Sequence, residues 1–504
     1  MSTERPLRIL VMGATGYIGG RLVPMLADAG HEVRCLTRRP EQLAGVDWAD
    51  RVEIVRGDAL DSSTLGPAME GVDVVYYLVH SIGTGASFQA ADRAAAGNTA
   101  TAAARAGVRR LVYLGGLVPE GPASAHLASR AEVGQIFLDG PVPAVVLQAG
   151  VIIGSGSASF EMLRYLTERL PVMVTPTWVS SCVQPIAVRD VLAYLTRVLE
   201  LPERTNRRFD IGGPDVLTYR EMMQRYAAVA GLSRRIIVPV PVLSPWLSSH
   251  WVNVITPVPK AIAQPLIESL RNDVVATEHD LEELLPRELC PFDEAVHLAL
   301  ERIRDAEVVT RWADASWPGA PSDPMPTDPE WSGGTAYRDE RSRVVDAPPD
   351  AVWRVVEGIG GERGWYSLPI AWAARGLLDR LAGGVGLRRG RRHPDRLALG
   401  DAVDFWRVEA LERPRLLRLR AEMRLPGEAW LEFRVEPGAR PVLHQKALFL
   451  PRGLLGHLYW WAIDPFHGVV FGSMIEQIAG AAEAAAREEP PVDEHQGGSA
   501  TSEA

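Results

Sequence analysis

The stretch Gly13-Ala14-Thr15-Gly16-Tyr17-Ile18-Gly19 decides the fold of the first part of the chain. An apolar run, 7–12, precedes it and a helix-forming run, 21–30, follows it, so a glycine-rich turn joins a strand to a helix. Glycines let the backbone approach a pyrophosphate closely, and the N–H groups at a helix start complement its negative charge. The turn therefore predicts a dinucleotide site, with a purely structural turn as the alternative. The turn residues expected to bind are Gly13, Thr15, Gly16, Tyr17, Ile18 and Gly19.

The second strand, predicted over 31–39, bears on which dinucleotide binds. A site that prefers NAD(H) places an acidic residue at the end of this strand for the ribose 2′-hydroxyl. This chain has Thr37, Arg38 and Arg39 there, and two guanidinium groups suit a 2′-phosphate. We therefore expect NADP(H) to be preferred, while NAD(H) stays open. The alternative is that both arginines only keep the strand end solvated.

Strands and helices continue to alternate, which is typical of an α/β fold with a Rossmann-type, doubly wound parallel sheet. Further strands are predicted over 52–58, 72–79, 111–114 and 144–150, and an alanine-rich helix over 90–106. Ligands of such sheets bind at the carboxyl ends of the strands. An acid at the end of the third strand suits the adenine amino group or, alternatively, caps the next helix. The residues expected around the cofactor are Asp58, Val79, His80 and Gln148.

Composition and charge narrow the class of protein. The chain has 504 residues, 47% of them hydrophobic and 23% charged, which indicates a globular protein with two or three domains. Its net charge of -10 argues against nucleic acid as a partner. Cys35, Cys182 and Cys290 are far apart, so we expect neither a disulfide framework nor a metal site. Without a signal-peptide pattern at the N-terminus, we expect a cytoplasmic protein.

One uncharged stretch raises the question of a membrane. Residues 236–259 contain no Lys, Arg, Asp or Glu, but five prolines would interrupt a helix repeatedly. We therefore expect a buried or ligand-facing segment. Trp246 and Trp251 make a peripheral membrane contact the alternative.

A proline-rich stretch predicts a domain boundary. Residues 317–329 hold five prolines together with Asp and Ser, a composition that favours neither helix nor sheet. The polar end of the chain predicts a disordered tail. The predicted parts are an NAD(P)-binding domain with substrate-cleft insertions over 1–310, a linker over 311–334, a second domain over 335–486 and the tail over 487–504.

The first domain combines four characteristic segments, which are 13–19, 57–61, 107–114 with Asn98 before it, and 148–154. Together they resemble the atypical short-chain dehydrogenases/reductases. The resemblance is to the NAD(P)H-binding branch that includes NmrA-like regulators and relatives of the complex I NDUFA-type accessory subunit. It covers about residues 6–300 and implies dinucleotide binding at the glycine turn, Arg38, Asp58 and the end of the fourth strand.

The segment that carries catalysis in that family differs here. Active members have a Ser after the fifth strand and a Tyr-x-x-x-Lys pair on the next helix, where the Lys lowers the pKa of the Tyr. This chain has Gly-Gly-Leu at 115–117, and His126 and Arg130 stand at the positions of the pair. His126 could act as a general acid near neutral pH, and Arg130 could hold the nicotinamide ribose or a substrate carbonyl. The alternative is that a His and an Arg lie there by chance.

In the second domain, apolar and polar residues alternate over 417–423 and 431–435, which predicts an antiparallel sheet with one wet face. A helix predicted over 464–487 follows it. This α+β pattern resembles the helix-grip fold of the START/polyketide-cyclase superfamily, which implies an apolar cavity. Motifs at 360–366, 383–391, 400–408 and 451–461 resemble more closely the uncharacterised DUF2867-type domain fused to such reductases. The whole chain then resembles the bacterial YbjT-like proteins.

Two classes of function stay open at this point. In one, NADPH reduces a small hydrophobic carbonyl compound or quinone, which makes the chain an NAD(P)H-dependent oxidoreductase. In the other, the first domain binds NAD(P)H without turnover, as a sensor or as an assembly or regulatory protein. The missing Tyr and Lys favour the second class, and the cleft-forming insertions favour the first. The sequence leaves the substrate and the oligomeric state open.

Overall fold

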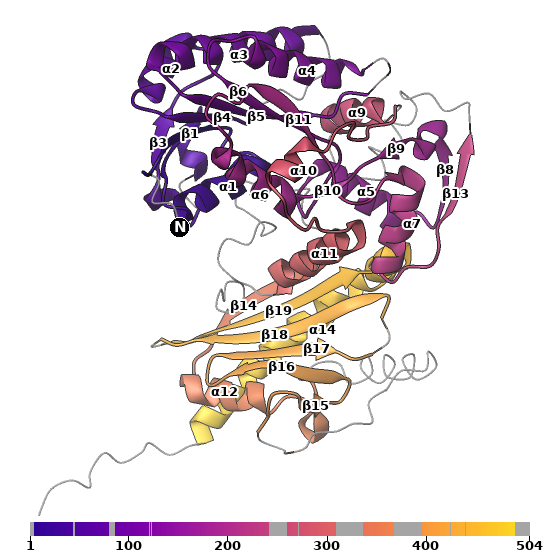
Figure 1. The fold of residues 1–504 in the computed structure, drawn as a ribbon. Coiled ribbons are helices and arrows are strands. Elements are labelled where there is room, and N and C mark those ends of the chain that lie inside the picture. Colours follow the sequence, from indigo (N-terminus) through magenta and orange to yellow (C-terminus); the bar gives the residue numbers. More distant parts are fainter. Residues whose placement is uncertain are drawn as a thin grey trace, which may run out of the picture. The chain divides into compact units, whose positions relative to one another are not determined.

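A seven-stranded parallel sheet forms the centre of the first of two units, which comprise Met1–Gly334 and Thr335–Ala504 (Figure 1). The computed structural model describes residues 5–43, 46–79, 86–119, 121, 123–240, 260–270, 272–308, 336–366, 393, 396–423, 425–438 and 440–488. The strand order is β11-β6-β5-β4-β1-β2-β3, so the predicted doubly wound sheet is confirmed. Its strands are β1 Arg8–Met12, β2 Glu32–Thr37, β3 Glu53–Arg56, β4 Val74–Tyr77, β5 Arg110–Gly116, β6 Ala144–Ala149 and β11 Arg207–Ile211.

Helices cover both faces of this sheet because its strands are apolar on both sides. In β1, Ile9 and Val11 belong to one buried cluster and Leu10 and Met12 to another, since successive side chains point to opposite faces. Helices α2, α3 and α4 lie on one face, and α1 and α6 on the other (Figure 1). These helices are α1 Tyr17–Asp28, α2 Ser62–Met69, α3 Ala86–Ala106, α4 Ala125–Leu138 and α6 Val188–Arg197.

The remaining elements of the first unit build a smaller lobe with its own apolar core, which includes Phe160, Met222 and Val296. This lobe is assembled from segments inserted after β6 and after β11. Its strands are β7 Ile152–Ile153, β8 Val172–Pro176, β9 Cys182–Val183, β10 Ile186–Ala187, β12 Leu217–Thr218 and β13 Ile236–Val240. Its helices are α5 Ala158–Arg169, α7 Tyr219–Val229, α9 Lys260–Ser269 and α11 Phe292–Val308. Helix α10 Asp280–Leu284 instead packs Leu281 into the core of the seven-stranded sheet.

The second unit is an antiparallel sheet with helices packed on it, ordered β14-β19-β18-β17-β16-β15. The predicted antiparallel sheet and its apolar face are confirmed, because Leu417, Leu419 and Leu431 are fully buried in one core with Met474 and Ile478 of the last helix. The opposite face is not wet throughout, since Arg418 and Glu432 are buried there as an ion pair. The helix-grip assignment stays a prediction. The elements are β14 Tyr337–Val344, α12 Pro349–Glu357, β15 Ala402–Val403, β16 Trp406–Glu412, β17 Leu416–Ala421, β18 Gly427–Glu436, β19 Val442–Pro451 and α14 Gly453–Glu488.

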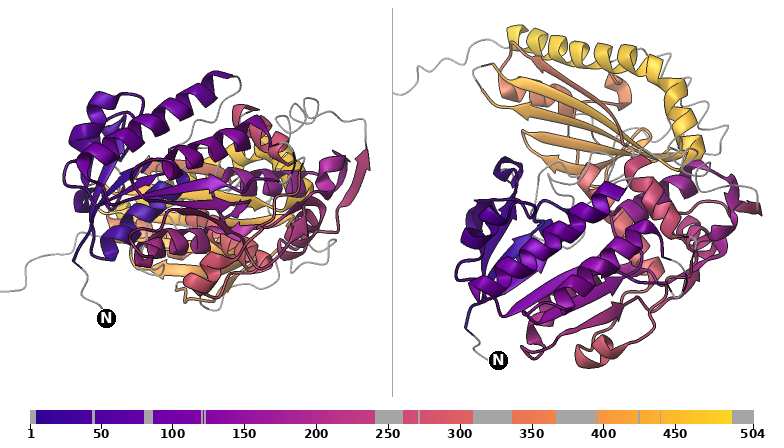
Figure 2. Two further views of the ribbon diagram at one scale, coloured as in Figure 1. Left: turned by 45° about the horizontal axis from the view of Figure 1, so that its top comes forward. Right: turned by 90° about the horizontal axis from the view of Figure 1, so that it is seen from above.

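The last helix, α14, is longer than the sequence predicted. It begins at Gly453 rather than at 464 and has 36 residues. Pro465 lies inside α14, and the helix bends along its length (Figure 2). A proline removes one backbone hydrogen bond from a helix, and the turns on either side of Pro465 are largely exposed.

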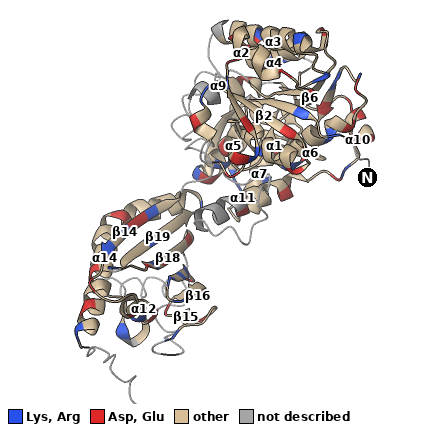
Figure 3. Ribbon diagram, turned by 90° about the vertical axis from the view of Figure 1, so that its left-hand side faces the viewer, with Lys and Arg blue, Asp and Glu red and all other residues tan. Residues whose placement is uncertain are grey.

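Several expectations fall on residues outside the described ranges. These are the linker, the tail beyond residue 488, His80 and the tryptophans proposed to touch a membrane. No described helix combines the length and the apolar character needed to cross a bilayer. Acidic and basic residues are interspersed over both units (Figure 3).

Candidate functional site

In the turn between β1 and α1, the positions of Gly13 and Gly19 leave no space for a side chain. Gly13 has a φ of +94°, and a Cβ there would lie 2.7 Å from the carbonyl oxygen of Leu78. A Cβ on Gly19 would meet the carbonyl oxygen of Gly13, to which the Gly16 N–H donates at 3.0 Å. No side chain of the described residues caps the start of α1 at Gly16. The turn thus offers uncapped N–H groups and a close backbone approach, which fits a pyrophosphate.

The end of β2 lies beside this turn, because β2 pairs with β1. The backbone N–H of Arg39 donates to the Thr37 hydroxyl at 3.2 Å, which fixes the chain as it leaves the strand. Arg38 and Arg39 are exposed, and neither forms an ion pair with a described residue. Both guanidinium groups are therefore available to an anionic ligand at this edge of the sheet.

The other residues expected around the cofactor have separate positions. Asp58 follows β3, and its carboxylate accepts from the Leu60 N–H at 3.0 Å. It does not cap α2, because Asp61 does so by accepting from the Ser63 N–H. Gln148 is buried in β6 and donates to the Gly116 carbonyl at 3.3 Å. Val79 follows β4 and is half-buried.

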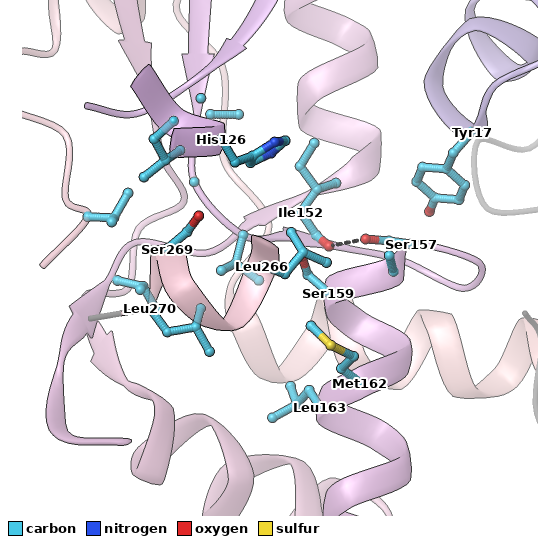
Figure 4. Close-up of a pocket in the computed structure, with 18 of the residues that line it drawn as sticks. Tyr17, His126, Ile152, Ser157, Ser159, Met162, Leu163, Leu266, Ser269 and Leu270 are labelled. Atoms are coloured by element: carbon cyan, nitrogen blue, oxygen red, sulfur yellow. Dashed lines mark hydrogen bonds between the residues drawn. The ribbon is translucent and has the colours of Figure 1, made fainter. Parts of the chain in front are cut away.

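A cavity of about 420 Å³ begins at the glycine turn and continues into the smaller lobe (Figure 4). Thr15, Gly16, Tyr17, Ile18 and Gly19 line its first part. The cavity therefore runs along the carboxyl edge of the sheet, beside the switch point between β1 and β4. Its further walls include Gly115, Gly116, His126, Arg130, Ser157, Ser159, Met162, Leu163, Leu166, Trp178, Tyr219, Met223, Leu266, Ile267, Ser269, Leu270 and Val274.

His126 lies in α4 at this cavity, as a neutral imidazole. It is only 7% exposed. Burial, together with the nearby Arg130 charge, lowers the pKa of His126 to about 4. At neutral pH the ring can therefore donate an N–H hydrogen bond but does not carry the extra proton that a general acid needs. The role of His126 in proton transfer stays a prediction.

Arg130 lies one turn further along α4 and lines the same cavity. Its Nη2 donates to the Leu114 carbonyl at 2.9 Å, which fixes the guanidinium at the end of β5. Its Nε is buried and has no hydrogen-bond partner among the described residues. A Cβ on Gly116 would lie 3.0 Å from the Leu127 side chain and at ordinary contact distance, 3.7 Å, from this Nε. His126 and Arg130 are thus brought together, as their spacing predicts.

The part of the cavity beyond His126 is lined mainly by apolar side chains. Two of its walls come from α5 and α9 of the smaller lobe. Sequence reasoning missed Tyr219 and Met223 of α7. No local signal marks them, because the packing of α7 against α5 alone brings them to the cavity.

Two family models match separate parts of the chain. The family described as NAD(P)H-binding matches residues 13–136, which include the glycine turn, His126 and Arg130. A family of unknown function, DUF2867, matches residues 331–474 in the second unit. The first unit therefore holds the NAD(P)H-binding domain.

Relatives with known names match the first part of the chain. It is 32% identical over 231 residues to the (4-alkanoyl-5-oxo-2,5-dihydrofuran-3-yl)methyl phosphate reductase of Streptomyces griseus, covering 44% of this chain and 74% of that protein. It is 29% identical over 246 residues to the ceramide reductase of Caulobacter vibrioides, covering 47% and 75%. A solved structure, Citrobacter triphenylmethane reductase complexed with NADP(H), is similar with a TM-score of 0.47 and 23% identity, covering 58% of this chain and 99% of that one. Through its first unit, the chain belongs to the NAD(P)H-binding, reductase-like family that includes the Streptomyces enzyme.

Proposed function

We propose that this protein is an NADPH-dependent reductase of a hydrophobic carbonyl compound or quinone. The observation that carries this proposal is the single cavity shared by the glycine turn and the apolar walls of the smaller lobe. Gly16 and Gly19 line it at one end, and Met162 and Leu166 line it elsewhere. A cofactor held at the turn and an apolar substrate would therefore meet inside one enclosure. The names of the two reductases among the relatives support the same class of reaction.

The cofactor would be held by this chain at three places. The uncapped N–H groups at the start of α1 would bind the pyrophosphate, and Gly13 and Gly19 allow its close approach. Arg38 and Arg39 would bind the 2′-phosphate of NADPH, since both are exposed beside the turn. When bound, NADPH supplies a hydride to a carbonyl compound, whose oxygen takes one proton from solvent to give an alcohol and NADP⁺, or to a quinone, which takes one proton and gives a hydroquinone and NADP⁺.

His126 and Arg130 would stabilise the substrate oxygen during this reaction. The neutral imidazole can donate an N–H hydrogen bond to the oxygen, and the nearby guanidinium favours the negative charge that develops there. Because His126 stays neutral around pH 7, its N–H donor remains available without protonation. Apolar neighbours such as Leu127 and Val151 keep water away and strengthen these interactions.

The test is a screen of hydrophobic aldehydes and quinones with NADPH, followed by its absorbance, together with calorimetric titration of NADPH. We expect oxidation of NADPH by at least one apolar substrate. The control is a Gly19→Ala variant, in which NADPH binding should weaken by about 10³-fold and turnover should fall with it. Tight NADPH binding without turnover of any substrate in the screen would contradict the reductase proposal.

A second candidate is a sensor that binds NAD(P)H without turnover. One specific observation favours it: α4 carries His126 and Arg130 where active short-chain reductases have Tyr and Lys, and His126 is neutral. In that case the cofactor would alter contacts of the protein with a partner. The same screen separates the two candidates, because only the reductase consumes NADPH.

A further inference from the structure

One face of α5 lines the cavity over two helical turns. Ser159, Met162, Leu163 and Leu166 all lie in its wall, and their spacing places them on the same side of the helix. The span from Ser159 to Leu166 is roughly 10 Å along the helix axis. The cavity thus has an elongated apolar branch that follows α5 away from the glycine turn.

Helix α9 forms a second wall of this branch through Leu266, Ile267 and Leu270. In Figure 4, Met162 and Leu163 lie on one side of the space and Leu266 and Leu270 on another, with His126 and Tyr17 toward its cofactor end. We call the space lined by Met162, Leu163, Leu166, Leu266, Ile267 and Leu270 the chain channel. Every one of these side chains is aliphatic.

The chain channel offers little to a polar ligand. Among its neighbours, Ser269 already bonds the Ser124 hydroxyl at 2.9 Å and the Pro265 carbonyl at 2.8 Å. The titratable side chains of the cavity wall, Tyr17, His126, Arg130 and Tyr219, are not among the six that define the channel. A sugar or another polyol placed among those six side chains would find few hydrogen-bond partners, which is costly. The nearest polar groups of the cavity wall include the Ser159 hydroxyl and the indole N–H of Trp178.

We propose that the chain channel binds a linear alkyl chain whose carbonyl group lies at His126 and Arg130. This proposal rests on the proposed reductase function and names its substrate class as a medium-chain or long-chain alkyl carbonyl compound. An elongated space between two aliphatic helix faces suits a flexible chain, which the methionine and leucine side chains can follow. The chain would lie along α5 and its far end would reach Leu166.

The first measurement is binding, so that it does not depend on turnover. Calorimetry of NADP⁺-loaded protein with straight-chain primary alcohols, from butanol to dodecanol, reports how the reaction product binds. We expect the affinity to rise about fourfold for each added methylene and then to level off when the channel is filled. An affinity independent of chain length would overturn the proposal.

Two substitutions of Leu166 should change, in opposite directions, the alcohol chain length at which the affinity levels off. Leu166→Trp should fill the far end, so that dodecanol binds at least about tenfold more weakly while butanol is unchanged. Leu166→Ala should lengthen the channel and shift the plateau to longer alcohols. Thermal unfolding and NADPH titration show whether each variant is folded. If Leu166→Trp does not fold, the Leu166→Ala shift alone decides. Equal changes for all chain lengths in a folded variant would contradict the channel.

Rates with straight-chain aldehydes separate this inference from the proposed function. Reduction of aldehydes with no preference for length would sustain the reductase and overturn the channel. Chain-length-dependent alcohol binding without any aldehyde reduction would sustain the channel and overturn the reductase. A parallel rise of kcat/KM and alcohol affinity with chain length supports both.

Discussion

The two ends of the cavity are built in different ways. At the proposed cofactor end the backbone would do the binding, and Gly13 and Gly19 are required there because a Cβ on either would meet neighbouring backbone. At the substrate end, side chains from α5, α7 and α9, which are far apart in the sequence, form the walls. A site made by a local turn can be read from its residues, whereas a site made by packed helices depends on the tertiary structure.

The largest effect should come from the most constrained residue of the cofactor end. In Gly19→Ala the new methyl group would meet the Gly13 carbonyl oxygen, so the turn and the start of α1 must separate. Losing two charge-assisted hydrogen bonds to a pyrophosphate should weaken NADPH binding by about 10³-fold. Calorimetric titration with NADPH measures this loss of affinity. Gly97→Ala in α3 is the matched control, because a Cβ there meets nothing within 4 Å. Equal affinities in both variants would show that the pyrophosphate does not bind at this turn.

This difference also explains how much the sequence could predict. The sheet followed from continuous apolar runs, and the glycine turn from spacing alone, because both are local patterns. The start of α14 was missed, because the helix continues through Pro465, whereas a proline usually interrupts a helix. The neutral state of His126 was missed as well, because its burial arises only when α4 packs beside the smaller lobe. Tyr219 and Met223 were missed because only the packing of α7 against α5 brings them to the cavity.

The second prediction concerns how the free energy of unfolding depends on pH through His126, which lies between the cofactor end and the substrate end of the cavity. Its pKa is about 4 in the folded protein, below the ordinary value of 6.5, so the unfolded chain binds this proton more readily. The stability it contributes is present above pH 6.5 and is lost as the pH falls toward 4. The loss should be about 3 kcal/mol between pH 7 and pH 4.

Chemical unfolding of the wild type and of His126→Gln over this range measures that loss. The difference between the two free energies of unfolding should change by this amount, because glutamine does not titrate. If the two proteins show the same pH dependence, His126 is not buried as a neutral ring.

The third prediction tests the chemistry at the same residue. If neutral His126 donates to the substrate oxygen, His126→Ala should lower kcat/KM by about 10²-fold and leave NADPH affinity unchanged. His126→Gln should recover part of the rate, because its amide N–H can replace the donor. The wild-type rate should also show no loss through a pKa near 6.5. A loss at that pH that disappears in His126→Gln would instead identify a protonated acid.

The smallest effect concerns the choice between the two dinucleotides, because it depends on one phosphate group at the exposed end of β2. Arg38→Asp combined with Arg39→Ala should weaken NADPH binding by about tenfold or more, since a charge-assisted phosphate contact contributes about 1.5–3 kcal/mol. NADH binding should be spared, because NADH lacks that phosphate. Arg105→Asp is the matched control. Arg105 is exposed at the end of α3, just before β5, so it lies at the amino ends of the strands, whereas Arg38 and Arg39 lie at their carboxyl ends. Calorimetric titration of all three proteins with both dinucleotides measures the difference. Equal losses for NADPH and NADH would mean that the arginines contact a part that both dinucleotides share. The end of β2 would then not determine which dinucleotide is preferred.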